Sequence, residues 1–440
     1  MKTLIKNATI VNEGRIFVGS VLIDGDKIAN ISETPDYSEY PDCSGIDATG
    51  MLLLPGVIDT HVHFRDGGLA DNPAGNFATE SRAARAGGVT SVIDMPNTNP
   101  QTISLEALEA KEARAAAVSV VNYGFMLGAT ADNLDWLLSM EPTRYAAIKL
   151  FLGSSTGNML LSDPAMLDRL FSEARKLIVA HCEEEAVVQT NLHNFKLEHQ
   201  GKPTETATLH PQIRNTEACF LSTYKAIERA RKYGTHLHIA HLSTATELSL
   251  LSNFDLGKKH VTAEVTPNHL FFDDRDYAEL GNLIKCNPAI KSNDDRLALW
   301  AALEDGLIDT IATDHAPHPL GAKQRPYFDA PSGIPSIQHS LQMMLEAAIS
   351  NEELMTLIVG KMCHNPALLF GIEGRGFIRQ GYKADLVLVR TGVEQKVTRE
   401  SLLYGCGWSP LEGQTFHTRI ERVWINGKED GSAEPLMFTH

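Results

Sequence analysis

Hydrophobic positions at the two ends of the chain form short runs separated by turn residues. Leu4–Val11 near the start, and Ala384–Val389 and Ile420–Ile425 near the end, have the length of single β-strands. Neither end has enough strands to cover its own apolar face. We therefore predict that residues 1–55 and 375–440 join in one small β-sandwich domain.

Between these ends, apolar runs alternate with helix-like stretches rich in Ala, Leu, Glu and Arg, such as Ser104–Val118 and Asn215–Tyr233. This alternation is typical of a parallel sheet whose strands are connected by helices. Eight short apolar runs occur, at residues 56–61, 91–95, 118–126, 146–151, 177–181, 237–241, 260–265 and 309–313. Eight such units predict an α/β fold, a TIM-like (β/α)8 barrel over residues 56–374. A doubly wound open sheet is the alternative, but no glycine-rich phosphate-binding fingerprint follows any run.

Composition and charge narrow the class of protein. The 440 residues are 43% hydrophobic and 21% charged, which is typical of a folded globular protein and excludes disordered and fibrous classes. The formal net charge is −16 at pH 7 without any basic run, so we expect neither nucleic acid nor a membrane as a partner. Six dispersed cysteines and the absence of a signal-like or membrane-spanning run favour a cytoplasmic location.

Histidines gather at the ends of the predicted strands. His61 and His63 end the first barrel run and, because strand side chains alternate, point to the same face and could share one metal ion. His181, His241 and Asp314 likewise end or follow apolar runs. Each alone could be a buried hydrogen-bonded histidine or a helix-capping aspartate. Together they favour a metal site, because the carboxyl ends of barrel strands converge on one face.

Two further features belong to the same predicted face. Lys149 lies inside an apolar run, where a charged amine is unexpected unless it is neutralised, used or able to reach solvent. His315 and His318 directly follow Asp314, so one could contact substrate while the other is structural. The segment Pro317–Ser332 is rich in Pro and Gly, and we predict a loop over the site.

Several motifs resemble the amidohydrolase superfamily and, within it, the dihydroorotases. The resemblance extends over essentially the whole chain and rests on Pro55–Arg65, Ala86–Thr90, Met95–Pro100, Ala180–Glu183, His241–Thr244, Asn287–Pro288 and Thr313–His318. The His-x-His pair with a late Asp is specific to the superfamily. Arg65 and the segment Pro96-Asn97-Thr98-Asn99-Pro100 narrow the resemblance to dihydroorotases.

The resemblance implies a cofactor, a set of site residues and a reaction. It implies two zinc ions per chain, bridged by a carbamylated lysine and a hydroxide, with the ligands His61, His63, Lys149, His181, His241 and Asp314. Asp314 would also be the catalytic proton shuttle. Substrate would contact Arg65, Asn97, Asn287, His318, Ser332 and Gly333. The implied reaction is the reversible cyclisation of N-carbamoyl-L-aspartate to L-dihydroorotate in de novo pyrimidine biosynthesis, and we expect a homodimer.

Two alternatives remain open. One is another cyclic amidase, such as a hydantoinase, dihydropyrimidinase or allantoinase, which shares the metal ligands but generally lacks the arginine at position 65. The other is a catalytically inactive scaffold homologue, although such proteins usually lack some of the ligands. Lys291 and the pair Ser332-Gly333 depart from the common dihydroorotase pattern, so the selectivity among cyclic amides is not determined by the motifs.

Overall fold

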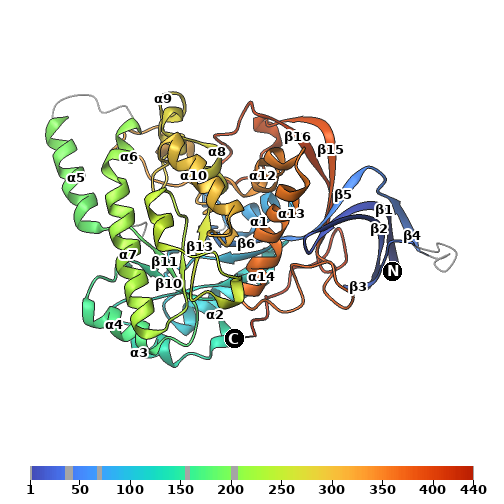
Figure 1. Ribbon diagram of the computed structural model, residues 1–440, viewed down its shortest axis with the longest axis horizontal. Coiled ribbons are helices and arrows are strands. Elements are labelled where there is room, and N and C mark those ends of the chain that lie inside the picture. The colour runs from blue at the N-terminus through green and yellow to red at the C-terminus, as the bar shows by residue number, and fades with distance from the viewer. Residues whose placement is uncertain (1, 35–42, 67–71, 154–158, 200–206, 440) are drawn as a thin grey trace.

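The structure, a computed structural model, describes residues 2–34, 43–66, 72–153, 159–199 and 207–439. Figure 1 shows a helix-surrounded body with strands inside it and a separate curved sheet on one side. No helix in the described ranges is both long and apolar enough to cross a membrane.

The inner strands form a parallel barrel. They are β6 (Val57–Val62), β7 (Val89–Asp94), β8 (Asn122–Phe125), β9 (Leu127–Gly128), β10 (Ile148–Phe151), β11 (Ile178–His181), β12 (Leu237–Ile239), β13 (Val261–Val265) and β14 (Thr310–Ile311). Each of the eight predicted runs overlaps one of these strands, and β9 continues β8 after Met126. The (β/α)8 fold class is therefore confirmed.

Backbone hydrogen bonds close the barrel in two places. The strands form the parallel sheets β6-β7-β8 and β9 to β14. Between β8 and β10, the amide of Ala146 donates to the carbonyl of Phe125 at 2.8 Å. Between the first and last strands, Val62 forms a parallel bridge with His315, and the amide of His63 donates to the His315 carbonyl at 2.8 Å.

The helices surround the barrel, and several begin at side chains that cap their free amides. The helices are α1 (Phe77–Ala86), α2 (Leu105–Val118), α3 (Leu134–Ser139), α4 (Pro164–Glu173), α5 (Glu185–Glu198), α6 (His210–Ile213), α7 (Thr216–Tyr233), α8 (Pro267–Phe271), α9 (Tyr277–Leu280), α10 (Asn293–Glu304), α11 (Leu320–Lys323), α12 (Ser340–Ala348), α13 (Glu352–Val359) and α14 (Asn365–Leu369). Asn76 and Ser292 form capping boxes at α1 and α10. Gly234, at φ 71°, ends α7 in the left-handed conformation.

Both ends of the chain contribute to one further sheet. Its strands are β1 (Lys2–Asn12), β2 (Arg15–Asp24), β3 (Lys27–Ser32), β4 (Ser44–Asp47), β5 (Met51–Pro55), β15 (Leu386–Lys396) and β16 (Thr415–Trp424). The order is β16-β15-β5-β1-β2-β3, with β4 paired to β1, and β5 runs antiparallel to β15.

The predicted β-sandwich is not confirmed, because the described terminal strands form a single seven-stranded sheet. Helices contact this sheet: α12 packs against β16, and α13 packs against β1 and β2 (Figure 1). The sequence predicts that the apolar face of the terminal strands must be covered, and helices of the central region cover part of it. The division into residues 1–55 plus 375–440 and 56–374 remains a proposal.

A buried polar network joins the terminal sheet to the barrel. Arg375 and Asp385, only 4% and 3% exposed, form an ion pair. Asp385 also accepts hydrogen bonds from the side chain of Asn122 in β8 at 3.1 Å and from the amide of Asn426 at 2.8 Å. Arg375 additionally donates to the side-chain Oδ1 of Asn426 at 2.8 Å. The network therefore fixes the start of β15 against the barrel.

We expect Arg375→Ala to lower the free energy of unfolding by about 3–5 kcal/mol, because it leaves the Asp385 carboxylate buried without its counter-charge. Urea unfolding followed by circular dichroism measures the change. Arg422→Ala is the control, since Arg422 and Glu429 form an exposed pair at 2.7 Å, and its cost should stay below about 1 kcal/mol. Equal effects of the two substitutions would contradict a joining role for the network.

Candidate active site

A pocket lies at the carboxyl ends of the barrel strands. All six predicted metal ligands line it, together with Arg65, Asn97, Phe151, Asn287, Ala316, Ser332 and Gly333. His318 is not a lining residue, but its ring contacts both Arg65 and Ser332. The pocket therefore brings together residues that are up to 272 positions apart, from His61 to Gly333.

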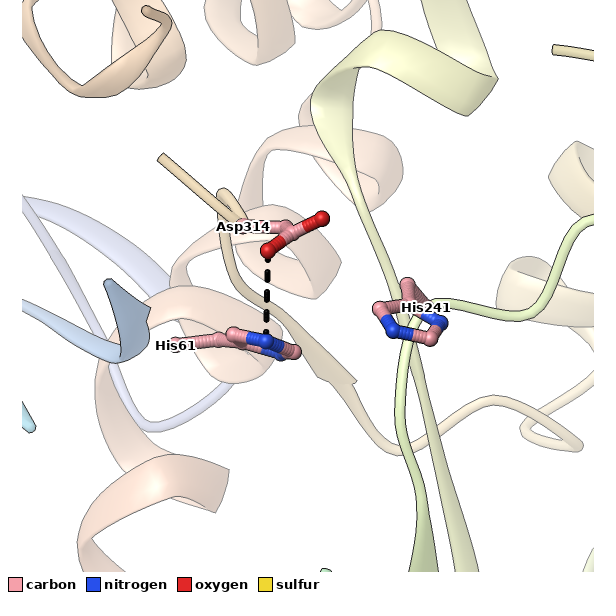
Figure 2. Close-up of side chains that lie close together, drawn as sticks. All are labelled: His61, His241 and Asp314. Carbon is pink, nitrogen blue, oxygen red and sulfur yellow. Dashed lines mark ion pairs between the residues drawn. The ribbon is translucent and has the colours of Figure 1, made fainter. Parts of the chain in front are cut away.

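Side chains from the ends of four barrel strands, β6, β11, β12 and β14, converge in the pocket. The carboxylate Oδ1 of Asp314 lies 3.3 Å from Nε2 of His61 and 3.0 Å from Nε2 of His63. On the other side, Nδ1 of His181 lies 2.9 Å from Nε2 of His241. Figure 2 shows Asp314 above the His61 ring and His241 beside them. Ligand atoms of His61, His241 and Asp314 all lie within 4.8 Å of one another, which makes this a candidate metal site.

Three pocket residues have a positive φ although they are not glycine. The φ angles are 59° at Arg65, 37° at His241 and 48° at Asp314. Left-handed backbone at such residues costs on the order of 1 kcal/mol and is concentrated at functional sites. Each follows a barrel strand, so the turn that ends the strand also directs the side chain into the pocket.

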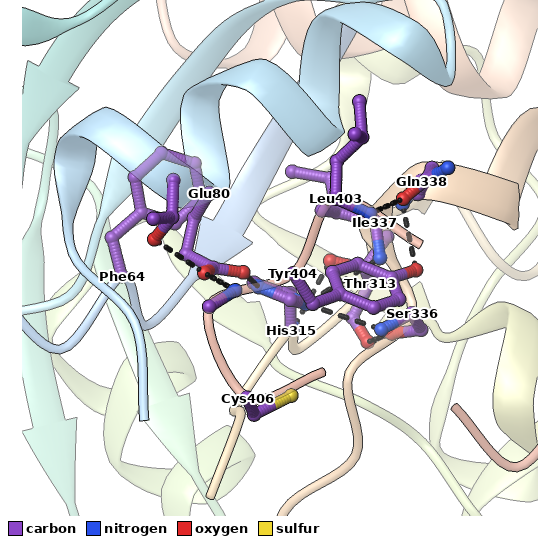
Figure 3. A network of polar contacts seen from close by, with 12 residues as sticks. Phe64, Glu80, Thr313, His315, Ser336, Ile337, Gln338, Leu403, Tyr404 and Cys406 are labelled. Carbon is purple, nitrogen blue, oxygen red and sulfur yellow. Dashed lines mark hydrogen bonds and ion pairs between the residues drawn. The ribbon is translucent and has the colours of Figure 1, made fainter. Parts of the chain in front are cut away.

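A buried hydrogen-bond network holds the residue next to Asp314 (Figure 3). Nδ1 of His315 accepts a hydrogen bond from the amide of Ser336 at 3.1 Å, so the ring proton is on Nε2. Nε2 lies 2.8 Å from Oε2 of Glu80 in α1, and the other oxygen of Glu80 accepts from the amide of Gly405 at 2.7 Å. Both ring nitrogens of His315 are thus hydrogen-bonded to other residues, and the ring does not line the pocket.

Polar partners behind the pocket orient its first two histidines. Nδ1 of His61 lies 2.7 Å from Oε1 of Glu264 in β13, and the same oxygen accepts from the amide of His241 at 3.2 Å. Nδ1 of His63 lies 2.7 Å from Oδ1 of Asn97. Acceptors at Nδ1 place the ring proton there and leave the Nε2 lone pair facing the pocket. Asn97 therefore holds His63 in addition to lining the pocket.

The second histidine pair has a different arrangement. Nε2 of His181 lies 3.0 Å from Oε2 of Glu183, which also binds Arg214. This directs Nδ1 of His181 into the pocket. Nδ1 of His241 is buried and has no hydrogen-bond partner among the described residues. His181 and His241 therefore present one nitrogen each to the same point.

Burial favours the neutral form of His63 and His241. It lowers the pKa of His63 to about 3 and holds the pKa of His241 well below its usual value. Burial would raise the pKa of Asp314, but the neighbouring His61 and His63 outweigh it and lower that pKa. At neutral pH the pocket therefore offers imidazole lone pairs and a carboxylate, which is the donor set that zinc binds.

Lys149 adds a nucleophilic amine to these donors. It is 1% exposed, and its Nζ has no hydrogen-bond partner among the described residues, with only the ring of Phe151 beneath it at 5.1 Å. Burial lowers its pKa to about 8, which increases the fraction of neutral amine. The Lys149 amine lies among metal-binding side chains and has no hydrogen-bond partner of its own among the described residues. It therefore fits conversion to a carbamate, which can ligate metal ions.

Arg65 is a half-buried cation at the pocket wall. Its Nε is buried without a hydrogen-bond partner, and no carboxylate forms an ion pair with it among the described residues. Its Nη2 lies 3.3 Å from Nε2 of His318, which lies 2.9 Å from the carbonyl of Ser332. This side of the pocket therefore favours an anion.

Comparison with known proteins agrees with this geometry. The amidohydrolase family profile matches residues 52–429. The chain belongs to the amidohydrolase family. It is 33% identical to a dihydroorotase of Halobacterium salinarum over 92% of this chain and 91% of that protein. It is 27% identical to an allantoinase of Salmonella choleraesuis over 96% and 94%. The structure of an L-hydantoinase (dihydropyrimidinase) from Arthrobacter aurescens superimposes with a TM-score of 0.91, at 26% identity and 99% coverage of both chains.

This amidohydrolase also contains site residues that the motifs did not indicate. Glu264 lies inside the apolar run 260–265, and Asp59 lies inside 56–61, where it accepts a hydrogen bond from the Thr313 hydroxyl at 2.6 Å. A charged residue within a predicted buried strand was the available signal, the same one that identified Lys149. Glu80 gave no such signal, because it lies on a helix.

We expect Glu264→Gln to lower the affinity of this amidohydrolase for zinc by about 10- to 100-fold, because His61 then faces a neutral amide. Competition with a fluorescent zinc chelator measures the affinity. Glu247→Gln is the control: Glu247 is 2% exposed but accepts hydrogen bonds from the hydroxyls of Thr223 and Thr244 and from none of the pocket histidines. Equal zinc affinity of the Glu264 variant and the wild type would show that this carboxylate does not support the ligand.

Proposed function

We propose that this amidohydrolase is a dihydroorotase, which interconverts N-carbamoyl-L-aspartate and L-dihydroorotate in de novo pyrimidine biosynthesis. The observation that carries the proposal is the half-buried Arg65 guanidinium at the wall of the pocket, whose Nε is buried without a hydrogen-bond partner and which pairs with no carboxylate among the described residues. Dihydroorotase relatives at about 33% identity support the same choice.

The carboxylate of the substrate explains why an arginine without a carboxylate partner lies at this wall. A partly desolvated guanidinium without a paired counter-ion is energetically costly, and a carboxylate can bind it through two parallel hydrogen bonds. L-Dihydroorotate carries such a carboxylate beside its ring, whereas hydantoin and dihydrouracil do not. We therefore assign Arg65 to that carboxylate, with His318 beside it.

We propose that two zinc ions occupy the pocket. His61, His63 and Asp314 would hold one, His181 and His241 the other, and a carbamate on Lys149 would bridge them. The carbamate forms when the neutral Nζ adds carbon dioxide and releases a proton. When bound, the zinc ions would polarise the ring carbonyl and lower the pKa of water toward neutrality.

Asp314 would move the proton. In ring opening its carboxylate takes a proton from the attacking water and passes it to the departing ring nitrogen; in ring closure the same transfer runs backwards. Its low pKa keeps it in the basic form at neutral pH. The Oδ1 of Asn287 is buried without a partner among the described residues, so we assign it to accept a hydrogen bond from a ring N–H. Ser332 and Gly333 would complete the wall.

The second candidate is a cyclic amidase for neutral rings. It is supported by the similarity to the allantoinase and to the L-hydantoinase structure. It does not account for Arg65. A catalytically inactive scaffold is the weakest alternative, because all six ligand positions are filled and line one pocket.

We expect the wild type to hydrolyse dihydroorotate in preference to hydantoin, dihydrouracil and allantoin. Arg65→Met should lower kcat/KM for dihydroorotate by at least about 100-fold, through loss of a charged hydrogen-bond pair, with zinc content unchanged. Arg229→Met is the control, since Arg229 pairs with Asp168 on the outer helices at 2.7 Å. Retained activity in Arg65→Met, or a wild-type preference for a neutral ring, would reject the proposal.

We expect Lys149→Ala to lose at least about tenfold in bound zinc, together with activity, because a bridging ligand is removed. Short carboxylic acids should restore part of both by replacing the carbamate. Elemental analysis and turnover with and without acetate measure the effect. Lys361→Ala tests specificity, since Lys361 is 6% exposed and donates to the carbonyl of Ile308 at 2.5 Å. Zinc binding that is indifferent to the loss of Lys149 would place the bridge elsewhere.

A further inference from the structure

A buried lysine lies behind the pocket wall. Lys323, the last residue of α11, is 1% exposed, and its Nζ donates to three backbone carbonyls, those of Lys285 at 2.9 Å, Pro331 at 3.0 Å and Gly333 at 2.8 Å. An ammonium group carries three N–H donors and a neutral amine only two. The three acceptors therefore favour the charged form of Lys323.

The same lysine fixes both peptide groups of Gly333. The carbonyl of Gly333 accepts from Lys323, and its amide donates at 2.8 Å to the carbonyl of Lys285, which Lys323 also binds. The backbone of Gly333, whose φ is 144°, packs closely against Ala316, since a Cβ built at Gly333 would lie 2.3 Å from the carbonyl oxygen of Ala316. The wall therefore has little room to move toward Ala316. One side chain thus binds the carbonyls on both sides of Ser332, those of Pro331 and Gly333.

In its protonated form, Lys323 also adds a positive charge to the wall. No carboxylate forms an ion pair with it in the described part of the chain, and burial, with Lys285 and Arg65 nearby, lowers its pKa to about 7. Two other buried lysines differ, because Lys259 pairs with Asp309 at 2.7 Å and Lys111 with Asp94 at 2.6 Å. In a chain of net charge −16, an uncompensated lysine and Arg65 therefore border the same wall.

We propose that Lys323 is a positioning residue for substrate selectivity: it holds the Ser332–Gly333 wall in place and makes that wall electropositive, so that the pocket binds an anionic ring. This inference rests on the proposed dihydroorotase function. Lys323 does not touch the reacting atoms, so its loss should weaken substrate binding much more than the chemical step.

The test is Lys323→Met in the full-length, zinc-loaded protein. We expect the KM for dihydroorotate to rise at least about tenfold, kcat to stay within about threefold, and zinc content to remain unchanged. Lys323→Gln, which keeps one hydrogen-bond donor group without the charge, should give the same KM effect and provides a second variant if the methionine does not fold. An unchanged KM in a folded variant would overturn the proposal.

Lys259→Met is the matched control. Lys259 is also buried and donates to the carbonyls of Gly306 at 2.7 Å and Leu307 at 3.3 Å, but it precedes β13, at the amino end of the barrel strands. Its loss should reduce stability and leave the KM unchanged. A KM increase equal to that of Lys323→Met would show a general stability effect and would overturn the proposal.

Hydrogen exchange separates this inference from the proposed function. Without any substrate, the amides of the segment 330–334, in which Pro331 carries none, should exchange at least about tenfold faster in Lys323→Met than in the wild type, because their anchor is lost. This measurement needs no activity. A wild type that does not act on dihydroorotate would reject the proposed function alone, whereas unchanged exchange at residues 330–334 would reject the positioning role of Lys323.

Discussion

Closure of the barrel between its first and last strands is the constraint on which the pocket depends. The hydrogen bond from the His63 amide to the His315 carbonyl, at 2.8 Å, brings the turn that contains Asp314 next to the His-x-His pair. Without that closure, the carboxylate of Asp314 could not lie 3.3 Å from His61. The network around Glu80 and His315 supports the same turn from the opposite side (Figure 3).

Charges are divided between the two sides of the pocket. Behind the histidines lie buried carboxylates, Glu264 and Glu183, and although burial would raise their pKa values, the neighbouring cationic and imidazole groups lower them. Around the Ser332–Gly333 wall lie cations instead, Arg65 and Lys323. One side is therefore suited to bind metal ions, and the other to bind an anion, which is the combination that a substrate with a carboxylate beside a hydrolysable ring requires.

Much of this arrangement can be predicted from the sequence, because the carboxyl ends of all strands in a parallel barrel lie on the same face. The runs ending at His61 and His181 could therefore be placed together without a structure. Contacts that depend on packing could not: the carboxylate of Glu264 reaches His61 across 203 positions, and no local spacing encodes that. The expected sandwich is not confirmed for a related reason, since local patterning shows that a sheet has an apolar face but not whether helices or strands will cover it.

The central claim is that six side chains surround paired metal ions in one pocket. Anomalous diffraction at the zinc absorption edge, on crystals grown with zinc and bicarbonate, tests it most directly. We predict two anomalous peaks in the pocket, one beside His61 and His63 and one beside His181 and His241, with added density on Lys149. Crystals whose pocket contains no anomalous peak, with zinc bound elsewhere or absent, would contradict the account.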